Sequence, residues 1–294
     1  MNGKENRKVI RVFSLASFLN DFGSDMIYPI WPLFVTSFLG VNMAVLGLID
    51  GLGDAIVSIS QAVSGYLSDR VRKRKVFIWT GYIFGSMSRI GYALSTVWQH
   101  LIPFRILDRS GKMRGAPRDA IVADVSTKEN RGKNFGLLRA MDNLGAVCGI
   151  ITCIFLFTYL GYKNLLLLAS IPSLVGVLLI LIFLKDKETE RIYKGLSLKD
   201  VTFDFKLFLF LSALFAIGSF SYSFLLVYAQ EFGFEKSFIP VLYLVFTGVA
   251  SLFSLPFGKL ADRLNRKFVL ILSYLFWGLV CLGFIYVESY VFLL

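Results

Sequence analysis

Long apolar segments recur along the whole chain, and they restrict its fold more than any other feature. Nine segments are long enough for a membrane-spanning helix, which needs about 20 mostly apolar residues. They cover residues 12–38, 43–66, 76–97, 101–123, 135–160, 163–184, 206–229, 238–260 and 269–290. Backbone polar groups in lipid must be satisfied within the segment itself. We therefore expect an all-α membrane protein.

The composition agrees with this fold class. Hydrophobic residues make up 56% of the chain and charged residues only 17%, which is less charge than a soluble domain carries. A net charge of +11 could suggest nucleic acid, but a membrane protein also concentrates Lys and Arg on its cytoplasmic side, where they meet anionic lipid. We expect the lipid bilayer as a partner and no nucleic acid.

The few cysteine and histidine residues indicate neither a cofactor nor a metal site. Cys148, Cys153 and Cys281 all lie inside apolar segments, and an odd number at these depths argues against a disulfide framework and against zinc. His100, the single histidine, lies in a predicted loop. We expect no metal and no cofactor.

The distribution of positive charge predicts the orientation in the membrane. With the N-terminus in the cytoplasm, 22 of the 31 Lys and Arg residues fall in inner segments. The outer loops then hold only Lys163 and Lys236. This imbalance follows the positive-inside rule, so we expect a multi-pass protein of the plasma or inner membrane with a cytoplasmic N-terminus.

A short motif occurs twice. Gly65-Tyr-Leu-Ser-Asp69-Arg70 returns 193 residues later as Gly258-Lys-Leu-Ala-Asp262-Arg263, and the same offset places the first three spans on the seventh to ninth. Parallel repeats of six helices are a known transporter plan. The sequence therefore predicts an N-terminal six-helix bundle at 1–184, a cytoplasmic linker at 185–205 and a partial C-terminal bundle at 206–294.

The repeat also predicts missing helices. With the offset of 193, Leu294 corresponds to position 101, where the fourth span begins. We interpret the chain as C-terminally truncated, about three helices short of a complete second half. A true nine-helix protein is the alternative.

The repeated motif resembles the loop between helices two and three of the major facilitator superfamily. Both copies depart from the family pattern at its second glycine, which is Arg72 in one copy and Asn265 in the other. The resemblance implies the major facilitator fold and a conformational latch between the halves, with the residues Gly65, Asp69, Arg70, Gly258, Asp262 and Arg263. Lys73, Arg74 and Lys75 are interpreted as ordinary topology-determining charges.

Charges inside the predicted spans of the first half are the strongest functional signal. Each costs roughly 2.5–3.5 kcal/mol near the centre of a membrane, so they must face water or one another. The candidates for a substrate or proton path are Asp21, Asp25, Asp50, Asp54, Arg105, Asp108, Arg109, Lys112, Arg139 and Asp142. Asp21 and Asp25 are four residues apart and are expected to share a helix face, as are Asp50 and Asp54.

The fourth span carries several of these charges. Its helical spacing predicts one stripe that contains Arg105, Asp108, Arg109, Lys112 and Asp119, with Arg114 and Arg118 opposite and a bend at Pro117. The stripe resembles the family's fourth-helix motif, which implies that Arg105 or Arg109 lines the cavity. Arg89, Arg114 and Arg118 are interpreted as structural.

Glycines in spans four and five are expected to permit close helix approach: Gly111, Gly115, Gly145 and Gly149.

These features predict a secondary active transporter that moves a small polar or amphiphilic solute by alternating access, with coupling to protons, as a monomer. The family's exchangers carry glycine-proline in the fifth helix, and Ala146 replaces that proline here, which argues against an exchanger. A truncated, transport-inactive fragment is the alternative.

We expect no enzyme, because no nucleophile–base pair, phosphate-binding loop or Cys/His cluster occurs. A channel would need a pore-lining repeat or filter loop, and neither is found.

Overall fold

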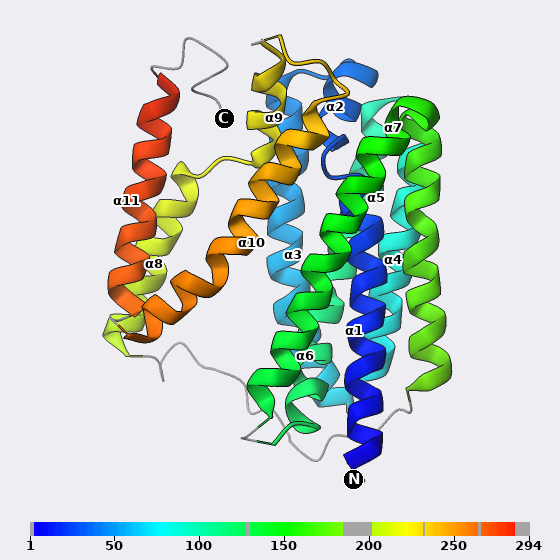
Figure 1. The fold of residues 1–294 in the computed structure, drawn as a ribbon, viewed down its shortest axis with the longest axis vertical. Coiled ribbons are helices and arrows are strands. Elements are labelled where there is room, and N and C mark those ends of the chain that lie inside the picture. The colour runs from blue at the N-terminus through cyan, green and yellow to red at the C-terminus, as the bar shows by residue number, and fades with distance from the viewer. Residues whose placement is uncertain (1–2, 128–129, 185–201, 232, 264–265, 286–294) are drawn as a thin grey trace. The chain divides into compact units, whose positions relative to one another are not determined.

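The structure is a computed structural model, and it describes residues 3–127, 130–184, 202–231, 233–263 and 266–285 (Figure 1). Every regular element in these ranges is a helix. The contacts divide the chain into two compact units, Met1–Gly195 and Leu196–Leu294. The boundary falls within the predicted linker 185–205, of which residues 185–201 lie outside the described part.

The first unit is a helical bundle whose longest element folds back on itself. Helix α7 contains Gly161 at φ 65°, a left-handed value that favours glycine, and there the chain turns back between the predicted fifth and sixth spans. Helix α1 lies between the two arms of α7 (Figure 1). The α-helices are α1 (Gly3–Asp25), α2 (Trp31–Leu33), α3 (Met43–Val71), α4 (Arg74–Leu94), α5 (Leu101–Ser110), α6 (Gly115–Asp124) and α7 (Arg131–Phe183).

The first predicted span, 12–38, is not one continuous helix. Helix α1 ends at Asp25, turns follow over 26–30, and the chain continues as α2 and a π-helix, Phe34–Phe38. Pro29 cannot donate a backbone hydrogen bond, and Pro32 occupies the first turn of α2, where no donor is needed. The break places the Trp31 side chain inside the bundle, where it is 1% exposed.

The fourth span, 101–123, is also divided. A 3₁₀ turn at Gly111–Arg114 separates α5 from α6, so the irregular turn lies just before Pro117 rather than at it. Proline at 117 cannot donate to the carbonyl of Met113 four residues earlier. That carbonyl accepts a hydrogen bond from Ser64 Oγ of α3, at 2.7 Å. The lost helical bond is thus replaced by a contact between two helices.

Helix α3 ends in a strained residue. Arg72, at φ 58° and ψ 21°, adopts the left-handed conformation that glycine accepts without steric cost. This is the position at which the repeated motif departs from the family's glycine. We expect Arg72→Gly to raise the free energy of unfolding by up to about 1 kcal/mol in chemical unfolding of the purified protein. Ala62→Gly, in the exposed interior of the same helix, should lower it by about 1 kcal/mol.

The second unit contains α8 (Phe203–Gly218), α9 (Tyr222–Glu231), α10 (Ile239–Arg263) and α11 (Arg266–Ile285). The seventh predicted span, 206–229, is interrupted between α8 and α9. There Ser219 Oγ donates to Ala216 O at 2.9 Å and Ser221 Oγ accepts from the Ser223 amide at 3.2 Å. Such side-chain bonds compete with helical ones. Helices α8 and α11 pack through Phe215 and Tyr274, whose stacked rings lie 3.9 Å apart.

Length and apolarity alone identify three described helical segments that could cross a membrane: Met43–Val71, Arg131–Phe183 and Phe203–Gln230, the last of which combines α8 with most of α9. Two shorter apolar helices lie at Ile239–Ala250 and Lys267–Gly283. Other helices of the first unit, such as α1 and α5, are less apolar because they carry charged residues.

Candidate functional site: buried charge clusters in the first unit

Several charged side chains of the first unit gather in three clusters, each of which is named after one residue. The Asp50 cluster contains Trp31, Asp50, Tyr92 and Arg105; the Asp142 cluster contains Ser17, Arg118, Asp119, Arg139 and Asp142; and the Arg74 cluster contains Asp69, Arg74 and Asp124.

The Asp50 cluster is the most buried. Arg105 Nη2 lies 2.6 Å from Asp50 Oδ1, and the two side chains are only 3% and 5% exposed. Trp31 Nε1 donates to the same oxygen at 3.1 Å. The Arg105 guanidinium also lies 4.4 Å from the centre of the Trp31 ring. A buried ion pair persists when further hydrogen bonds and a cation–π contact support it, as they do here.

A glycine makes room for this cluster. A Cβ atom added to Gly53 of α3 would lie 3.1 Å from Arg105 Nε and 3.2 Å from Arg109 Cγ. The missing side chain allows both arginines of α5 to pass close to α3. Any larger residue at position 53 would push against the two guanidinium groups.

Arg109 lies one helical turn beyond Arg105 and extends the polar region towards α1. Its Nη1 donates to Tyr28 Oη at 3.2 Å, and its guanidinium lies 5.4 Å from the Tyr28 ring centre. Asp108 Oδ2 is 3.7 Å from Arg109 Nε, and Ser88 Oγ donates to Asp108 Oδ1 at 3.3 Å. Asp25, the last residue of α1, is also buried.

Arg89 of α4 is fully buried, and no described carboxylate lies within ion-pair distance of it. Its guanidinium instead donates to Ala169 O at 2.7 Å, Ser173 Oγ at 2.6 Å and Ser24 Oγ at 2.7 Å. These bonds tie α4 to α1 and to the second arm of α7. The contacts fit the structural role that the sequence suggested for Arg89.

The Asp142 cluster joins α1, α6 and α7. Arg118 lies between Asp119, at 3.0 Å, and Asp142, at 3.8 Å, and its Nη1 donates to Ser17 Oγ at 2.6 Å. Arg139 lies 3.5 Å from Asp119 and 3.3 Å from Asp142, but its side chain is 61% exposed. Two guanidiniums therefore share two carboxylates at the edge of the bundle.

The Arg74 cluster involves a residue whose role the sequence analysis missed. Arg74, interpreted as an ordinary topology-determining charge, is buried and bridges Asp69 of α3 and Asp124 of α6, with ion-pair distances of 2.6 Å to each. Arg70, the predicted latch residue, is exposed and donates only a long bond, 3.4 Å, to Tyr66 Oη. Asp69 thus pairs with Arg74 within the described structure.

We expect Arg74→Gln to lower the free energy of unfolding by about 1–3 kcal/mol, because two carboxylates lose a charged hydrogen-bond donor. Chemical unfolding of the purified protein would measure this. The control is Lys133→Gln, which removes an exposed charge from the start of α7 and should change stability by less than about 0.5 kcal/mol. Equal stability of both variants would contradict the bridging role.

Other predicted site residues are not brought together as expected. Asp54 is exposed although Asp50 is buried, and Lys112 is only half-buried. Asp21 is half-buried and accepts a hydrogen bond from Asn20 Nδ2 at 2.8 Å. Asp119 is not part of a stripe with Arg105: it pairs with Arg118, which the sequence analysis had placed on the opposite side. The predicted latch residues Gly258, Asp262 and Arg263 lie at positions whose surroundings are outside the described part.

The close approaches predicted for glycines are found at three of the four positions. A Cβ at Gly145 would overlap the carbonyl oxygen of Phe18, and one at Gly149 that of Phe22. One at Gly111 would overlap Gly81 O. Gly115 has more room, since its nearest neighbour, Gln61 Nε2, would be 3.8 Å away. Among the described residues, no group of three or more acidic, His or Cys side chains could hold a metal ion.

The fold resembles solved membrane transporters. A bacterial homologue of the human lysosomal transporter Spinster, in an inward-facing and unoccupied conformation, matches 90% of this chain with a TM-score of 0.66 at 16% identity. A bacterial homologue of the human drug peptide transporters PepT1 and PepT2 matches 90% with a TM-score of 0.59 at 14% identity. The chain spans 64% and 57% of these two proteins. The all-helical bundle therefore has the fold of these solved proteins.

The sequence places the chain within one family. The model of the Major Facilitator Superfamily matches residues 13–294. An uncharacterized MFS-type transporter of Methanocaldococcus jannaschii is 38% identical over 300 residues, which cover 98% of this chain and 75% of that protein. The quinolone resistance protein NorA of Staphylococcus aureus is 29% identical over 143 residues, 48% of this chain and 36% of that protein. The chain belongs to the major facilitator superfamily, as the repeated motif predicted.

Proposed function

We propose that this protein is a secondary active transporter of a small polar or amphiphilic solute, and that the Asp50 cluster is part of its substrate and proton path. The observation that carries the proposal is the buried Asp50–Arg105 pair. Charges inside membrane bundles are costly and mark transport pathways. A purely structural pair could be replaced by apolar residues without loss, whereas a transport pair could not.

The geometry supports a specific coupling step. Asp50 Oδ1 accepts from both Arg105 and Trp31, so a proton arriving at Asp50 would weaken both interactions. Arg105 would then be available to hold an anionic or polar group of the solute. Loss of the proton would restore the pair and release the solute. Alternating access would expose this cluster to the two sides of the membrane in turn.

Uptake into everted membrane vesicles tests the proposal. The panel of labelled solutes should include an amino acid, a dipeptide, a sugar and a fluoroquinolone, the last because NorA is named for quinolone resistance. We expect at least one solute to accumulate only when a proton gradient is present, and Asp25→Asn and Asp50→Asn to abolish that accumulation. Asp204→Asn, at an exposed acid of α8, is the matched control.

Two results would contradict the proposal. Equal, gradient-independent flux in the wild type and both variants would exclude proton coupling through these acids. Absence of flux for every solute, with correctly inserted protein, would favour the alternative of a transport-inactive chain.

We also propose that the Arg74 cluster acts as a conformational latch and that the protein works as a monomer in the plasma or inner membrane. Asp69 and Asp124 come from different helices and meet at one guanidinium, so a movement between α3 and α6 would have to break an ion pair. The positive charge of the segments around Arg74 favours a cytoplasmic position for the latch and for the N-terminus.

A further inference from the structure

A row of aromatic side chains leads from the Asp50 cluster to one end of the first unit. The ring centre of Phe34 lies 6.4 Å from that of Trp31, and both side chains are buried. Beyond Phe34 come Phe38, at 5.3 Å, and Tyr162 of α7, at 5.8 Å. Aromatic rings at these separations attract one another. The row is therefore a continuous packed contact between the buried ion pair and the turn of α7.

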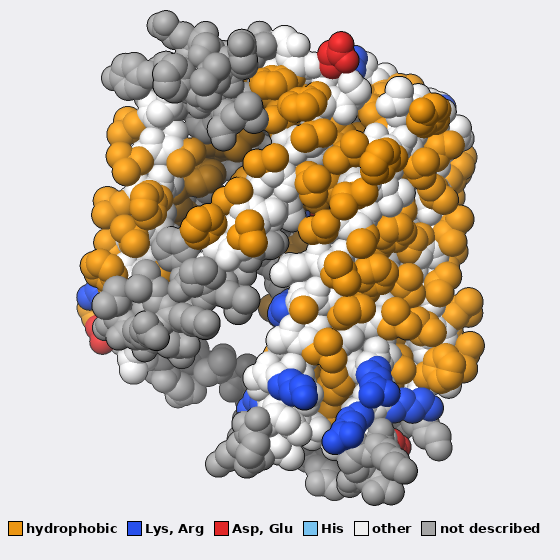
Figure 2. Space-filling model, in the orientation of Figure 1, with side chains coloured by type: hydrophobic (Ala, Val, Ile, Leu, Met, Phe, Trp, Pro, Cys, Tyr) orange, Lys and Arg blue, Asp and Glu red, His pale blue; other side chains and the backbone are white. Residues whose placement is uncertain are grey.

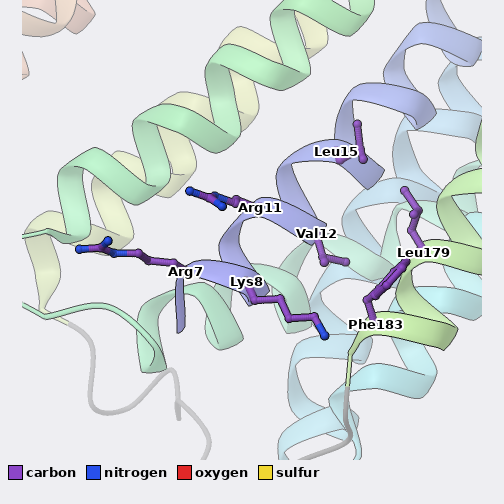
Figure 3. Close-up of a pocket in the computed structure, with 7 residues that line it drawn as sticks. All are labelled: Arg7, Lys8, Arg11, Val12, Leu15, Leu179 and Phe183. Atoms are coloured by element: carbon purple, nitrogen blue, oxygen red, sulfur yellow. The ribbon is translucent and has the colours of Figure 1, made fainter. Parts of the chain in front are cut away.

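This row lies at the end of the first unit that is opposite to the N-terminus. In Figure 1, α2 and the turn of α7 lie at one end and the beginning of α1 at the other. Figure 2 shows Lys and Arg side chains gathered along the lower edge of the apolar face of this unit. A groove at that lower end is lined by cations: Arg7 and Arg11 extend to one side of α1, and Lys8 lies against Phe183 on the other (Figure 3). With these cations in the cytoplasm, as proposed above, residues 31–38 lie at the outer end.

Two interactions hold Trp31 at the ion pair. Its Nε1 donates to Asp50 Oδ1 at 3.1 Å, and its ring lies 4.4 Å from the Arg105 guanidinium. A hydrogen bond to an ionised acceptor is roughly twice as strong as a neutral one, so the hold on Trp31 depends on the charge of Asp50. The titratable side chains near Asp50 include Asp54 on α3, Tyr92 on α4, and Arg105, Asp108 and Arg109 on α5.

The segment after α2 is wound more loosely than an α-helix. The Leu39 amide donates to Phe34 O, five residues earlier, at 3.0 Å, and the Val41 amide donates to Val35 O, six residues earlier, at 3.3 Å. An α-helix uses a spacing of four. Single π-helical turns are rare and occur frequently at functional sites. Tightening this turn to α-helical spacing gives the segment a second arrangement, and conformational coupling requires an element with two arrangements.

The outer end of the segment is held less firmly than Trp31. Phe38 is 45% exposed, and its ring centre lies 5.4 Å from that of Tyr162. The Tyr162 hydroxyl is buried but has no hydrogen-bond partner in the described structure. Separation of these two rings would break no described side-chain hydrogen bond and would give the hydroxyl access to water. This end can therefore open at a lower cost than the end at Asp50.

We propose that Trp31 is a positioning residue that links the charge of Asp50 to the outer end of residues 31–38. While Asp50 is charged, the indole holds the segment against Tyr162 and this end is closed. When Asp50 loses its charge, the weakened hydrogen bond frees the indole, the turn at 34–38 tightens, and the end opens. The inference rests on the proposed path through Asp50 and adds the means by which its charge controls access.

Thiol labelling of the purified full chain in detergent tests this link without any solute. Val35→Cys places a reporter in the π-helix at a position that is 0% exposed. Ser37→Cys, at an exposed position of the same turn, is the matched control and should react at one rate in all variants. The background protein carries Ala in place of the three native cysteines, Cys148, Cys153 and Cys281.

We expect Asp50→Asn to raise the rate at which Val35→Cys reacts with a water-soluble maleimide by about fivefold or more. Trp31→Phe keeps a ring beside Arg105 but removes the indole donor, so it should raise the rate by a similar factor. In the Trp31→Phe protein, Asp50→Asn should then add nothing further. If Asp50→Asn does not fold, Trp31→Phe alone still tests the link, with Tyr92→Phe, which keeps the ring packed on Trp31, as its control.

Two outcomes would overturn the link. An unchanged rate at Val35→Cys in Asp50→Asn or in Trp31→Phe would show that this contact does not keep the outer end closed. An equal effect of Asp50→Asn with and without the indole would show that the signal does not pass through Trp31. Absence of transport in the vesicle assay, with the expected labelling pattern, would contradict the proposed function but support the link.

Discussion

Replacing Arg105 by Met should lower the free energy of unfolding by about 3–5 kcal/mol, because Asp50 is left as a buried charge without its guanidinium partner. The Asp50 side chain is only 5% exposed, so water cannot replace the lost partner. The double variant Asp50→Asn/Arg105→Met should regain most of this stability, since Asn still offers an oxygen to Trp31 Nε1 and no unpaired charge remains. Chemical unfolding of the purified proteins in detergent would measure both effects.

Transport distinguishes the functional role of this pair from its structural role. If the pair only held α3 against α5, the folded double variant should transport as well as the folded wild-type protein. If the pair is part of the substrate and proton path, the double variant should be stable but inactive in the vesicle assay.

Arg139→Met is the control for the Arg105 variant. The Arg139 side chain is 61% exposed, so loss of its ion pairs should cost less than about 1 kcal/mol. Equal losses of stability in the Arg105 and Arg139 variants would show that burial does not strengthen the Asp50 pair. If the Arg105→Met variant is as stable as the wild type, the Asp50 carboxyl group is not ionised in the folded protein.

Much of the fold could be predicted from the sequence because long apolar segments have few alternatives to the helix. The turn at Gly161 lies between the predicted fifth and sixth spans, and the repeated motif identified the family before any comparison. In contrast, the break after Asp25 was missed. Residues 26–38 are apolar enough to continue the span, and only Pro29 and Pro32 signal the turn.

The stripe on the fourth span shows why the site was harder to predict than the fold. The prediction assumed 3.6 residues per turn from Arg105 to Asp119. The 3₁₀ turn at Gly111–Arg114 has about 3.0 residues per turn, which rotates the following residues by about 80° over four positions. Asp119 is therefore turned away from Arg105 and towards Arg139 of α7. A periodicity argument holds only while the helix type stays constant.

Ion pairs between distant segments could not be predicted from the sequence, for a different reason. Arg74 and Asp124 are 50 residues apart, and no local spacing connects them. Charge counting predicted that the acids and bases of the spans would pair, but it could not assign the partners. Arg74 was missed because it belongs to a basic run whose other members suit a purely topological interpretation.

Gly149→Val should be among the most disruptive single substitutions in the first unit. A Cβ at Gly149 would overlap the Phe22 carbonyl oxygen and lie 3.1 Å from the backbone carbonyl carbon of Asp25. Because the neighbouring atoms are backbone, α1 and α7 would have to separate, at a cost of about 1–3 kcal/mol or more. The displacement would also reach Asp25, so we expect transport to fall further than stability alone explains.

The matched control is Gly136→Val, on the same helix. A Cβ at Gly136 would meet no neighbouring atom within 4 Å, so this variant changes helix propensity without crowding. Chemical unfolding should show little change for Gly136→Val and a large loss for Gly149→Val. Equal effects would mean that glycine matters there for chain flexibility and not for contact between α1 and α7. The close approach would then not be what positions Asp25, and the link proposed here between the packing of α1 and the proton path would have to be abandoned.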